Sequence, residues 1–253
     1  MKILHEITER TKERIEARKR EVSPIEVSAK AHSLPTDGFS FEKALKSDDI
    51  AFICEVKKAS PSKGIISEDF PYLEIAQSYE AAGAAAISVL TEPYYFKGAD
   101  SYLREIADVV KIPLLRKDFT IDSYMIYEAK VLGADAVLLI CAVLDRGAVA
   151  EYIGIADSLG LSVLVEIHDE DEAETALSAG ARIIGVNNRN LKTFEVDITL
   201  SERLRKLVPD NVIFVAESGI TTREDVSRLR KIGADAALVG EALMRGTKLE
   251  WLR

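Results

Sequence analysis

Apolar runs and amphipathic runs alternate along residues 50–240 of the chain. The apolar runs are short, as buried strands are, and the segments between them show the apolar period of helices, as at Leu200, Leu204 and Leu207. Eight strands are predicted in this way, at residues 50–56, 84–90, 112–116, 136–141, 162–167, 182–187, 212–217 and 236–240. Strands that alternate with helices favour a parallel sheet covered by helices.

A glycine followed by an alanine recurs at the end of four predicted helices, directly before a strand. These pairs begin at Gly83, Gly133, Gly180 and Gly233, at intervals of about 50 residues, so each interval would hold two strand–helix units. Glycine is expected there as the left-handed residue that ends a helix. The even spacing favours a closed barrel, and no strand is followed by the Gly-x-Gly-x-x-Gly motif of a dinucleotide fold. The predicted fold class is therefore α/β, a single (β/α)8 TIM barrel.

The residues before the first predicted strand form an N-terminal extension, 1–49. An apolar stripe at helical spacing within the heavily charged residues 2–22 predicts an amphipathic surface helix. Residues 23–49 contain two prolines and a glycine and are predicted to be irregular, with a short helix near residues 41–45. The length fits one barrel domain, 1–253, that includes the extension.

Charge and apolar content argue against several classes of protein. The chain has 33 Lys and Arg residues against 42 Asp and Glu residues, a net charge of −9, so no nucleic-acid partner is expected. No signal peptide and no run of roughly 18 apolar residues for a membrane span is visible. Cys54 and Cys141 follow strand-like runs and resemble small core residues more than a disulfide pair, which favours a cytoplasmic location.

Ionisable and amide side chains lie where the predicted strands end. In a barrel the carboxyl ends of all strands converge on one face, so residues that are distant in sequence can share a site. The first strand ends in Glu55 and Lys57, the third in Lys117, the fifth in Glu166 and the sixth in Asn187. Structural ion pairs alone explain such a set poorly, and a catalytic site is predicted.

Two loops of small residues indicate a phosphate site. Ser218-Gly219 and Gly240-Glu241 follow the seventh and eighth strands, where barrels commonly bind phosphate through backbone N–H groups. Tight turns are the alternative interpretation of the two glycines. Because the Glu241 carboxylate would repel a phosphate, only its N–H group is expected to contribute.

Lys117 and Glu166 are suited to proton transfer. The like charge of Lys57 is expected to destabilise the Lys117 ammonium and to make it a better proton donor near neutral pH. His168 is expected to point away from Glu166 and to be a loop or packing residue. The three histidines form no metal-binding motif, and no serine lies in a Gly-x-Ser-x-Gly elbow, so neither a metal site nor a hydrolase triad is predicted.

Taken in order, these segments resemble the indole-3-glycerol phosphate synthase family. The resemblance covers most of the chain and is carried by Glu55-Val56-Lys57-Lys58-Ala59-Ser60-Pro61-Ser62-Lys63-Gly64, Ser88-Val89-Leu90-Thr91-Glu92, Tyr95-Phe96-Lys97-Gly98, Lys117-Asp118-Phe119, Glu166-Ile167-His168, Gly185-Val186-Asn187-Asn188-Arg189-Asn190-Leu191, Ala216-Glu217-Ser218-Gly219-Ile220 and Val239-Gly240. It implies a lyase of tryptophan biosynthesis that closes the indole ring of 1-(2-carboxyphenylamino)-1-deoxyribulose 5-phosphate. The reaction releases CO2 and water and needs neither a cofactor nor a metal.

The resemblance also implies roles for individual residues. Lys117 would be the general acid that protonates the substrate carbonyl, and Glu166 would stabilise developing charge and handle protons during dehydration. Glu55 and Asn187 would hold hydroxyls, while Lys57 would neutralise substrate anions or act as a second acid. The other implied contacts are Ser218, Gly219, Gly240 and Glu241 for the phosphate, Ser60 and Arg189 for the carboxylate, and Phe119, Leu138 and Leu191 for the aromatic ring. The extension would lie over the C-terminal face of the barrel of a monomer, whose partner is this small phosphorylated substrate.

Three alternatives remain open at this point. Phosphoribosylanthranilate isomerase shares the barrel and the phosphate site but normally uses a Cys/Asp pair, whereas Cys54 here faces opposite to Glu55. An aldolase could form a Schiff base at Lys117. A non-enzymatic sugar-phosphate sensor, or a barrel used as an inert scaffold, would not explain so many ionisable groups on one face.

Overall fold

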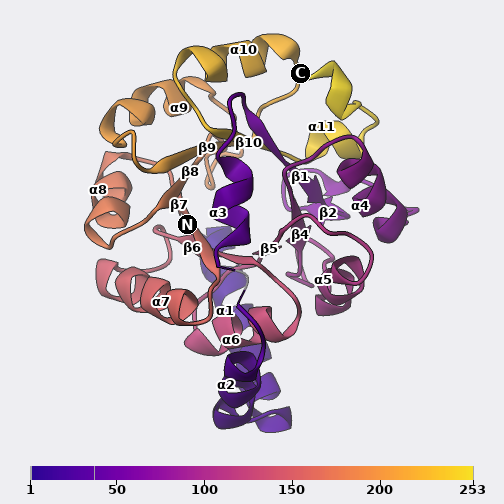
Figure 1. The fold of residues 1–253 in the computed structure, drawn as a ribbon, viewed down its shortest axis with the longest axis vertical. Helices are drawn as coiled ribbons and strands as arrows, with labels where there is room; N and C mark the ends of the chain where they lie inside the picture. The colour runs from indigo at the N-terminus through magenta and orange to yellow at the C-terminus, as the bar shows by residue number, and fades with distance from the viewer. Residues whose placement is uncertain (1, 37, 253) are drawn as a thin grey trace.

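The computed structural model describes residues 2–36 and 38–252. In this part of the chain, parallel strands close into a barrel in the order β1-β10-β9-β8-β7-β6-β5-β4 (Figure 1). The strands are β1 (Ala51–Val56), β4 (Ala86–Leu90), β5 (Leu114–Lys117), β6 (Ala136–Ile140), β7 (Ser162–Ile167), β8 (Ile183–Asn187), β9 (Ile213–Glu217) and β10 (Ala236–Val239). The predicted eight-stranded barrel is confirmed, and each strand overlaps its predicted range.

Helices form a ring outside the strands (Figure 1). They are α4 (Tyr72–Ala81), α5 (Asp100–Ala107), α6 (Ser123–Val131), α7 (Arg146–Ser158), α8 (Glu170–Ser178), α9 (Thr199–Leu204), α10 (Arg223–Lys231) and α11 (Glu241–Met244), with short 3-10 helices at Arg205–Leu207 and Leu249–Trp251. Gly83, Gly133, Gly180 and Gly233 all have positive φ angles, from 72° to 89°. They therefore end four of these helices in the left-handed conformation, as predicted.

The extension contains a helix that the sequence did not predict. α1 (Lys2–Glu21) and α3 (Ser40–Leu45) match expectations, but α2 (Pro24–Ser33) fills part of the segment predicted to be irregular. Ser23 caps α2 by accepting a hydrogen bond from the N–H of Glu26, whose carboxylate bonds back to the N–H of Ser23. Pro24 stands in the first turn, where its missing N–H costs nothing, so the proline begins a helix there instead of preventing one.

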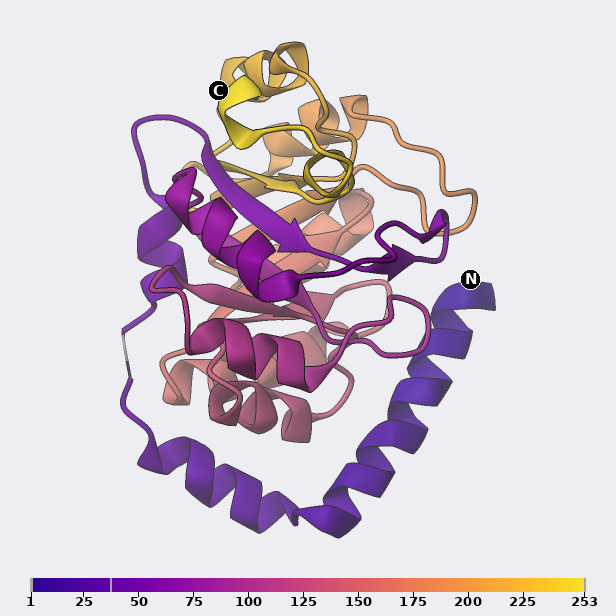
Figure 2. The same ribbon diagram turned by 90° about the vertical axis from the view of Figure 1, so that its right-hand side faces the viewer.

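The extension runs from one end of the barrel to the other (Figure 2). The first turns of α1 reach the C-terminal face, where Ile3, Leu4 and Ile7 line a cavity. Further along, α2 packs beside α6. Phe41 and Leu45 of α3 are fully buried in the interior cluster of the barrel at the opposite end. Only the start of the extension therefore covers the C-terminal face of the barrel. The end of the extension, α3, closes the opposite end of the barrel.

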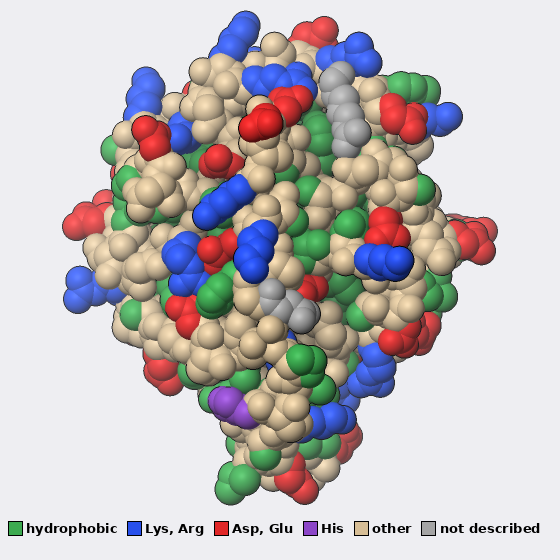
Figure 3. Space-filling view, viewed as in Figure 1, with side chains coloured by type: hydrophobic (Ala, Val, Ile, Leu, Met, Phe, Trp, Pro, Cys, Tyr) green, Lys and Arg blue, Asp and Glu red, His purple; other side chains and the backbone are tan. Residues whose placement is uncertain are grey.

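The face closed by α3 carries positive and negative side chains intermixed (Figure 3). Arg182 is typical, because its Nη2 lies 2.8 Å from carboxylate oxygens of both Glu42 and Asp157. Opposite charges in such pairs leave no extended field of one sign on this face. Among residues 2–36 and 38–252, no helix combines the length and the apolar content that crossing a membrane requires.

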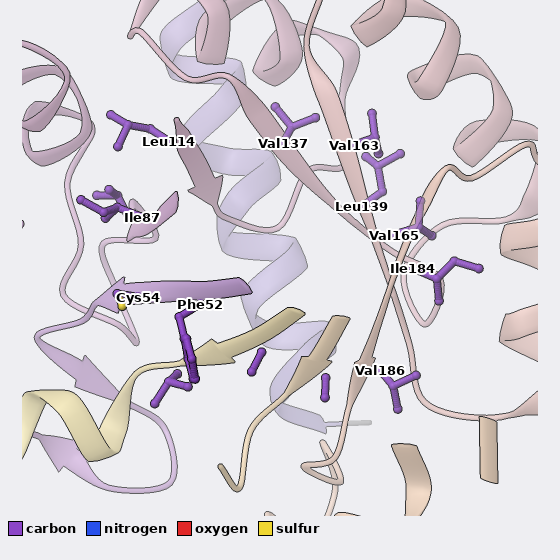
Figure 4. Packing of buried hydrophobic residues seen from close by; sticks show 14 of the residues in the cluster. Phe52, Cys54, Ile87, Leu114, Val137, Leu139, Val163, Val165, Ile184 and Val186 are labelled. Carbon is purple, nitrogen blue, oxygen red and sulfur yellow. The ribbon is translucent and has the colours of Figure 1, made fainter. Parts of the chain in front are cut away.

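The core consists of two layers separated by the strands. Ala51 and Ile53 of β1 face the interior of the barrel, whereas Phe52 and Cys54 face outward and pack against the surrounding helices (Figure 4). Successive side chains of a strand point to opposite faces, so the inward series continues through Glu55 at the end of β1. The same alternation selects which polar side chains enter the barrel mouth.

Candidate active site

A cavity of about 570 Å³ opens at the carboxyl ends of the barrel strands. Every site residue proposed from the sequence lines it: Glu55, Lys57, Ser60, Lys117, Phe119, Leu138, Glu166, Asn187, Arg189, Leu191, Ser218, Gly219, Gly240 and Glu241. Seven of the eight barrel strands or the loops after them contribute these residues. The fold therefore brings side chains from most of the sequence to one place.

Lys117 lies between two buried glutamates. Its Nζ is 3.1 Å from Glu166 Oε2 and 3.6 Å from Glu217 Oε2. The Lys117 side chain is 14% exposed, and the two glutamates are 3% and 2% exposed. Little solvent screens the three charges from one another, so each strongly affects the protonation of the others.

The expected effect on the Lys117 pKa was wrong in sign. Burial alone would lower the pKa of Lys117, but the carboxylates of Glu166, Glu217 and Glu55 outweigh it and raise the pKa well above its ordinary value. Burial likewise opposes ionisation of Glu166, yet Lys117 and His168 hold its pKa well below the usual range. Three acidic side chains from other strands surround Lys117, whereas the expectation from the sequence rested on the like charge of Lys57 alone.

Glu217 is the main site residue that the sequence analysis did not propose. Burial and the negative charges of Glu166 and Glu55 outweigh the charge of Lys117 and raise the pKa of Glu217 to about 8. Glu217 therefore holds its proton more readily than an ordinary carboxyl group does. Strand alternation could have identified it, because Val215 faces the barrel interior and Glu217 lies two residues further along β9.

The neighbours of Lys117 in the sequence are anchored by buried ion pairs. Arg116 donates at 2.8 Å to both Asp100 and Glu128. Asp118 accepts two hydrogen bonds of 2.8 Å from Arg14 of α1. These contacts fix β5 on both sides of the lysine and tie α1 to the strand that carries it.

Glu55 and Lys57 form an ion pair at the end of β1. Beyond them, β2 (Ala59–Ser60) and β3 (Gly64–Ile65) pair as a small antiparallel hairpin, and Ser60 thereby joins the cavity wall. Gly240 gives the Glu55 carboxylate its space. A Cβ atom at Gly240 would overlap Glu55 Oε1 and lie 3.1 Å from Glu55 Cδ.

The loop after β9 presents its backbone in an unusual conformation. Ser218 and Gly219 both have positive φ angles, 64° and 82°. Asn187 Oδ1 accepts a hydrogen bond of 2.9 Å from Ser218 Oγ, and Asn188 Nδ2 donates one of 3.1 Å to the Ser218 carbonyl. A loop with consecutive positive φ angles can turn its backbone N–H groups toward a bound anion. The hydrogen bonds with Asn187 and Asn188 hold the loop in this conformation.

Three cations surround the carboxylate of Glu241. Its oxygens lie 3.7 Å from Lys63 Nζ, 3.6 Å from Arg189 Nη2 and 3.1 Å from Arg245 Nε. The repulsion that Glu241 would exert on a phosphate is thus compensated locally. Lys63 and Arg245 also line the cavity and were not proposed from the sequence.

Apolar side chains form part of the cavity lining. Phe119, Leu138 and Leu191 line the cavity together with residues of α1, and the ring centroid of Phe96 lies 6.1 Å from that of Phe119. Such apolar and aromatic side chains suit an aromatic ring.

The expected orientation of His168 was wrong. His168 lies two residues after Glu166, so both side chains emerge on the same side, and His168 Nε2 is 3.3 Å from Glu166 Oε1. The residue does not line the cavity but stands behind the glutamate that does.

Replacing Gly240 with alanine should lower kcat/KM about 10-fold or more. This corresponds to a loss of about 1.36 kcal/mol or more of transition-state stabilisation. The added methyl group must push the Glu55 carboxylate out of its pair with Lys57. Steady-state kinetics on the phosphorylated substrate measures the effect. Gly154→Ala is the matched control, because a Cβ atom there meets nothing within 4 Å. Equal kinetics for the two variants would show that the space at Gly240 is not required.

Solved structures of other barrels share the architecture at low sequence identity. The tryptophan synthase a2b2 complex of Pyrococcus furiosus includes a chain with a TM-score of 0.60 and 17% identity, with 81% of this chain and 98% of that chain covered. The N-acetylmannosamine-6-phosphate 2-epimerase of Clostridium perfringens has a TM-score of 0.60 and 20% identity, with 77% and 88% covered. At such identities the likeness shows the fold alone.

Sequence comparison is far more specific. The family model of indole-3-glycerol phosphate synthase matches residues 4–251. The indole-3-glycerol phosphate synthase of Ruminiclostridium cellulolyticum is 60% identical over 256 residues, with 99% of this chain and 98% of that protein covered. The enzyme of Endomicrobium trichonymphae is 56% identical over 253 residues, with 99% and 98% covered. The chain therefore belongs to the indole-3-glycerol phosphate synthase family, the carboxy-lyases that form indole-3-glycerol phosphate in tryptophan biosynthesis.

Proposed function

We propose that Lys117 and Glu166 carry out the proton transfers of ring closure and dehydration in this cavity. The observation that supports this most directly is the buried cluster of Lys117, Glu166 and Glu217 in the cavity wall. An ammonium between two buried carboxyl groups, of which Glu217 holds its proton more readily, has a proton to donate to the substrate and a neighbour that can restore it.

Ring closure needs one proton. The ring carbon that bears the carboxylate attacks the carbonyl carbon of the ribulose chain, a C–C bond forms, and the carbonyl oxygen becomes a hydroxyl by taking the proton of Lys117. The attacking ring gives a π electron pair to the new C–C bond and so loses its aromaticity in this step. Cleavage of the bond to CO2 returns an electron pair to the ring and restores the aromatic system.

Dehydration then removes the new hydroxyl as water. The hydroxyl must be protonated as its C–O bond breaks, and the neighbouring carbon must lose a proton to complete the indole double bond. Glu166 handles these protons in this proposal, which the 3.1 Å distance between its Oε2 and Lys117 Nζ supports. Glu217, on the other side of the lysine, can return a proton to Lys117.

The rest of the cavity would bind and orient the substrate. The N–H groups around Ser218, Gly219, Gly240 and Glu241 hold the phosphate, while Glu55 and Asn187 hold hydroxyls. Lys57 neutralises substrate anions. Arg189 and Ser60 receive the carboxylate, and the aromatic ring lies against Phe119, Leu138 and Leu191.

We further infer that the chain works as a monomeric cytoplasmic enzyme and folds as one domain over residues 1–253. Residues of this one chain surround the cavity, and Phe41 of the extension is buried inside the barrel. The extension and the barrel thus share one core.

Of the alternatives, the isomerase would need a cysteine at the C-terminal face of the barrel, whereas Cys54 packs in the outer layer.

The purified protein should convert 1-(2-carboxyphenylamino)-1-deoxyribulose 5-phosphate into a product with indole fluorescence without an added metal. A fluorescence assay after dialysis against a chelator tests this, and CO2 release should match indole formation mole for mole. Turnover that depends on an added metal, or trapping of Lys117 by borohydride with a keto substrate, would contradict the proposed chemistry.

A further inference from the structure

His168 stands behind Glu166, on the side away from Lys117. Its Nε2 is 3.3 Å from Glu166 Oε1, while the other oxygen of that carboxylate, Oε2, is 3.1 Å from Lys117 Nζ. The contact of Nε2 with Oε1 has the length of an ion pair but not the alignment of a hydrogen bond, and Nε2 is buried. Glu166 is thus held between a group in the cavity wall and a group outside it.

The second ring nitrogen of His168 faces another carboxylate. Nδ1 is 3.0 Å from Glu172 Oε2, and the same oxygen accepts the backbone N–H of His168 at 2.7 Å. Glu172 lies in the first turn of α8, where its own N–H donates to the capping residue Asp169 at 2.9 Å. The start of α8 therefore fixes the carboxylate that orients the imidazole.

Two carboxylates opposite two ring nitrogens favour the imidazolium form. A neutral ring carries one N–H, so its other nitrogen would turn a lone pair toward a carboxylate. Burial opposes the charge, but Glu166 and Glu172 outweigh it and raise the pKa of His168 to about 10. The other titratable groups near this cluster are Lys117 of β5, Glu217 of β9, Asp169 before α8 and Cys141 after β6.

We propose that His168 is a positioning residue for the reaction, a buried cation that turns Glu166 Oε2 toward Lys117 and keeps Glu166 ionised between turnovers. The four groups form a row of alternating charge, Lys117, Glu166, His168 and Glu172. The proposal rests on the proposed role of Glu166. It extends the functional unit beyond the cavity to α8, whose residues Glu170–Ser178 do not line the cavity.

The first test measures the ring itself and needs no activity. The chain has only three histidines, so 15N-histidine labelling yields three ring systems, and His168→Gln assigns one of them. At about pH 8, above the ordinary histidine pKa of roughly 6.5, the His168 ring should show two protonated nitrogens. A His168 ring that is neutral at that pH would overturn the proposal.

The second test separates positioning from packing. His168→Gln should lower kcat about 10- to 100-fold with a smaller change in KM, as expected when a proton-transfer group is misplaced. Loss of the adjacent cation should also move the acid limb of the pH–rate profile upward by about one unit or more. Glu172→Gln should shift it in the same direction, and His32→Gln on α2 should not. Equal losses of kcat at every pH would mean a structural role only and would overturn the proposal.

The variant Glu166→Gln tests the proposed function separately. If Glu166→Gln kept full turnover, the proposed function would fail, whatever the protonation state of the His168 ring.

Discussion

Lys117→Ala should reduce kcat by roughly 10²- to 10⁴-fold, the usual contribution of a positioned acid. The variant loses the proton for the substrate carbonyl and also the cation that separates Glu166 from Glu217. Without that cation the two buried carboxylates cannot both ionise easily, so the pKa of Glu166 should rise. Single-turnover fluorescence would place the loss in the chemical steps.

Two controls accompany this variant. Lys12→Ala removes a lysine whose side chain is 61% exposed on α1, and it should leave kcat unchanged. Thermal denaturation of Lys117→Ala should show a cooperative transition, because removing a buried cation affects stability as well as catalysis. A folded Lys117→Ala enzyme with undiminished turnover would leave Lys57 as the first proton donor.

Glu166→Gln should reduce kcat by roughly 10²-fold or more while preserving the volume of the side chain. The amide cannot take up a proton during dehydration. It also withdraws a carboxylate that holds the pKa of Lys117 high, so that pKa should fall. Since Lys117 acts as an acid only while protonated, the alkaline limb of the pH–rate profile should move to lower pH.

Measurement of kcat from acid to alkaline pH checks both the size and the direction of this effect. Glu170→Gln is the matched control, because Glu170 is half-exposed on α8 and pairs only with Arg203 among the described residues. Its profile should coincide with that of the unmodified chain. Full activity for Glu166→Gln would show that another group, with Glu217 the first candidate, handles the protons of dehydration.

Local patterns in the sequence predicted most of the architecture. Apolar runs and helical periods located all of the barrel strands, and the glycines after the helices explained the even spacing. The prediction failed at α2, where residues 23–49 were predicted to be irregular although Ser23 and Glu26 form a capping box in front of Pro24. Capping depends on which backbone groups need partners, and a proline fits only the first turn.

Part of the candidate site followed from the same reasoning, because parallel strands bring their carboxyl ends together, and the family resemblance supplied the contacts expected at Ser60, Phe119, Leu138, Arg189 and Leu191. The residues predicted there do line one cavity. Glu217 was passed over although its strand points it inward, and His168 was given the wrong orientation although it lies two positions after Glu166. Both errors arose from applying the two-residue period of a strand to some strand ends and not to others.

The amino-acid sequence by itself determined the barrel, the family and the residue types at each strand end, because these depend on periodicity and order along the chain. Only the tertiary structure decided the protonation of those residues. The pKa of Lys117 is raised, not lowered, because Glu55, Glu166 and Glu217 come from three different strands and meet around it in a buried space. The charge on a buried group depends on its neighbours in space, and no single segment of the chain contains them.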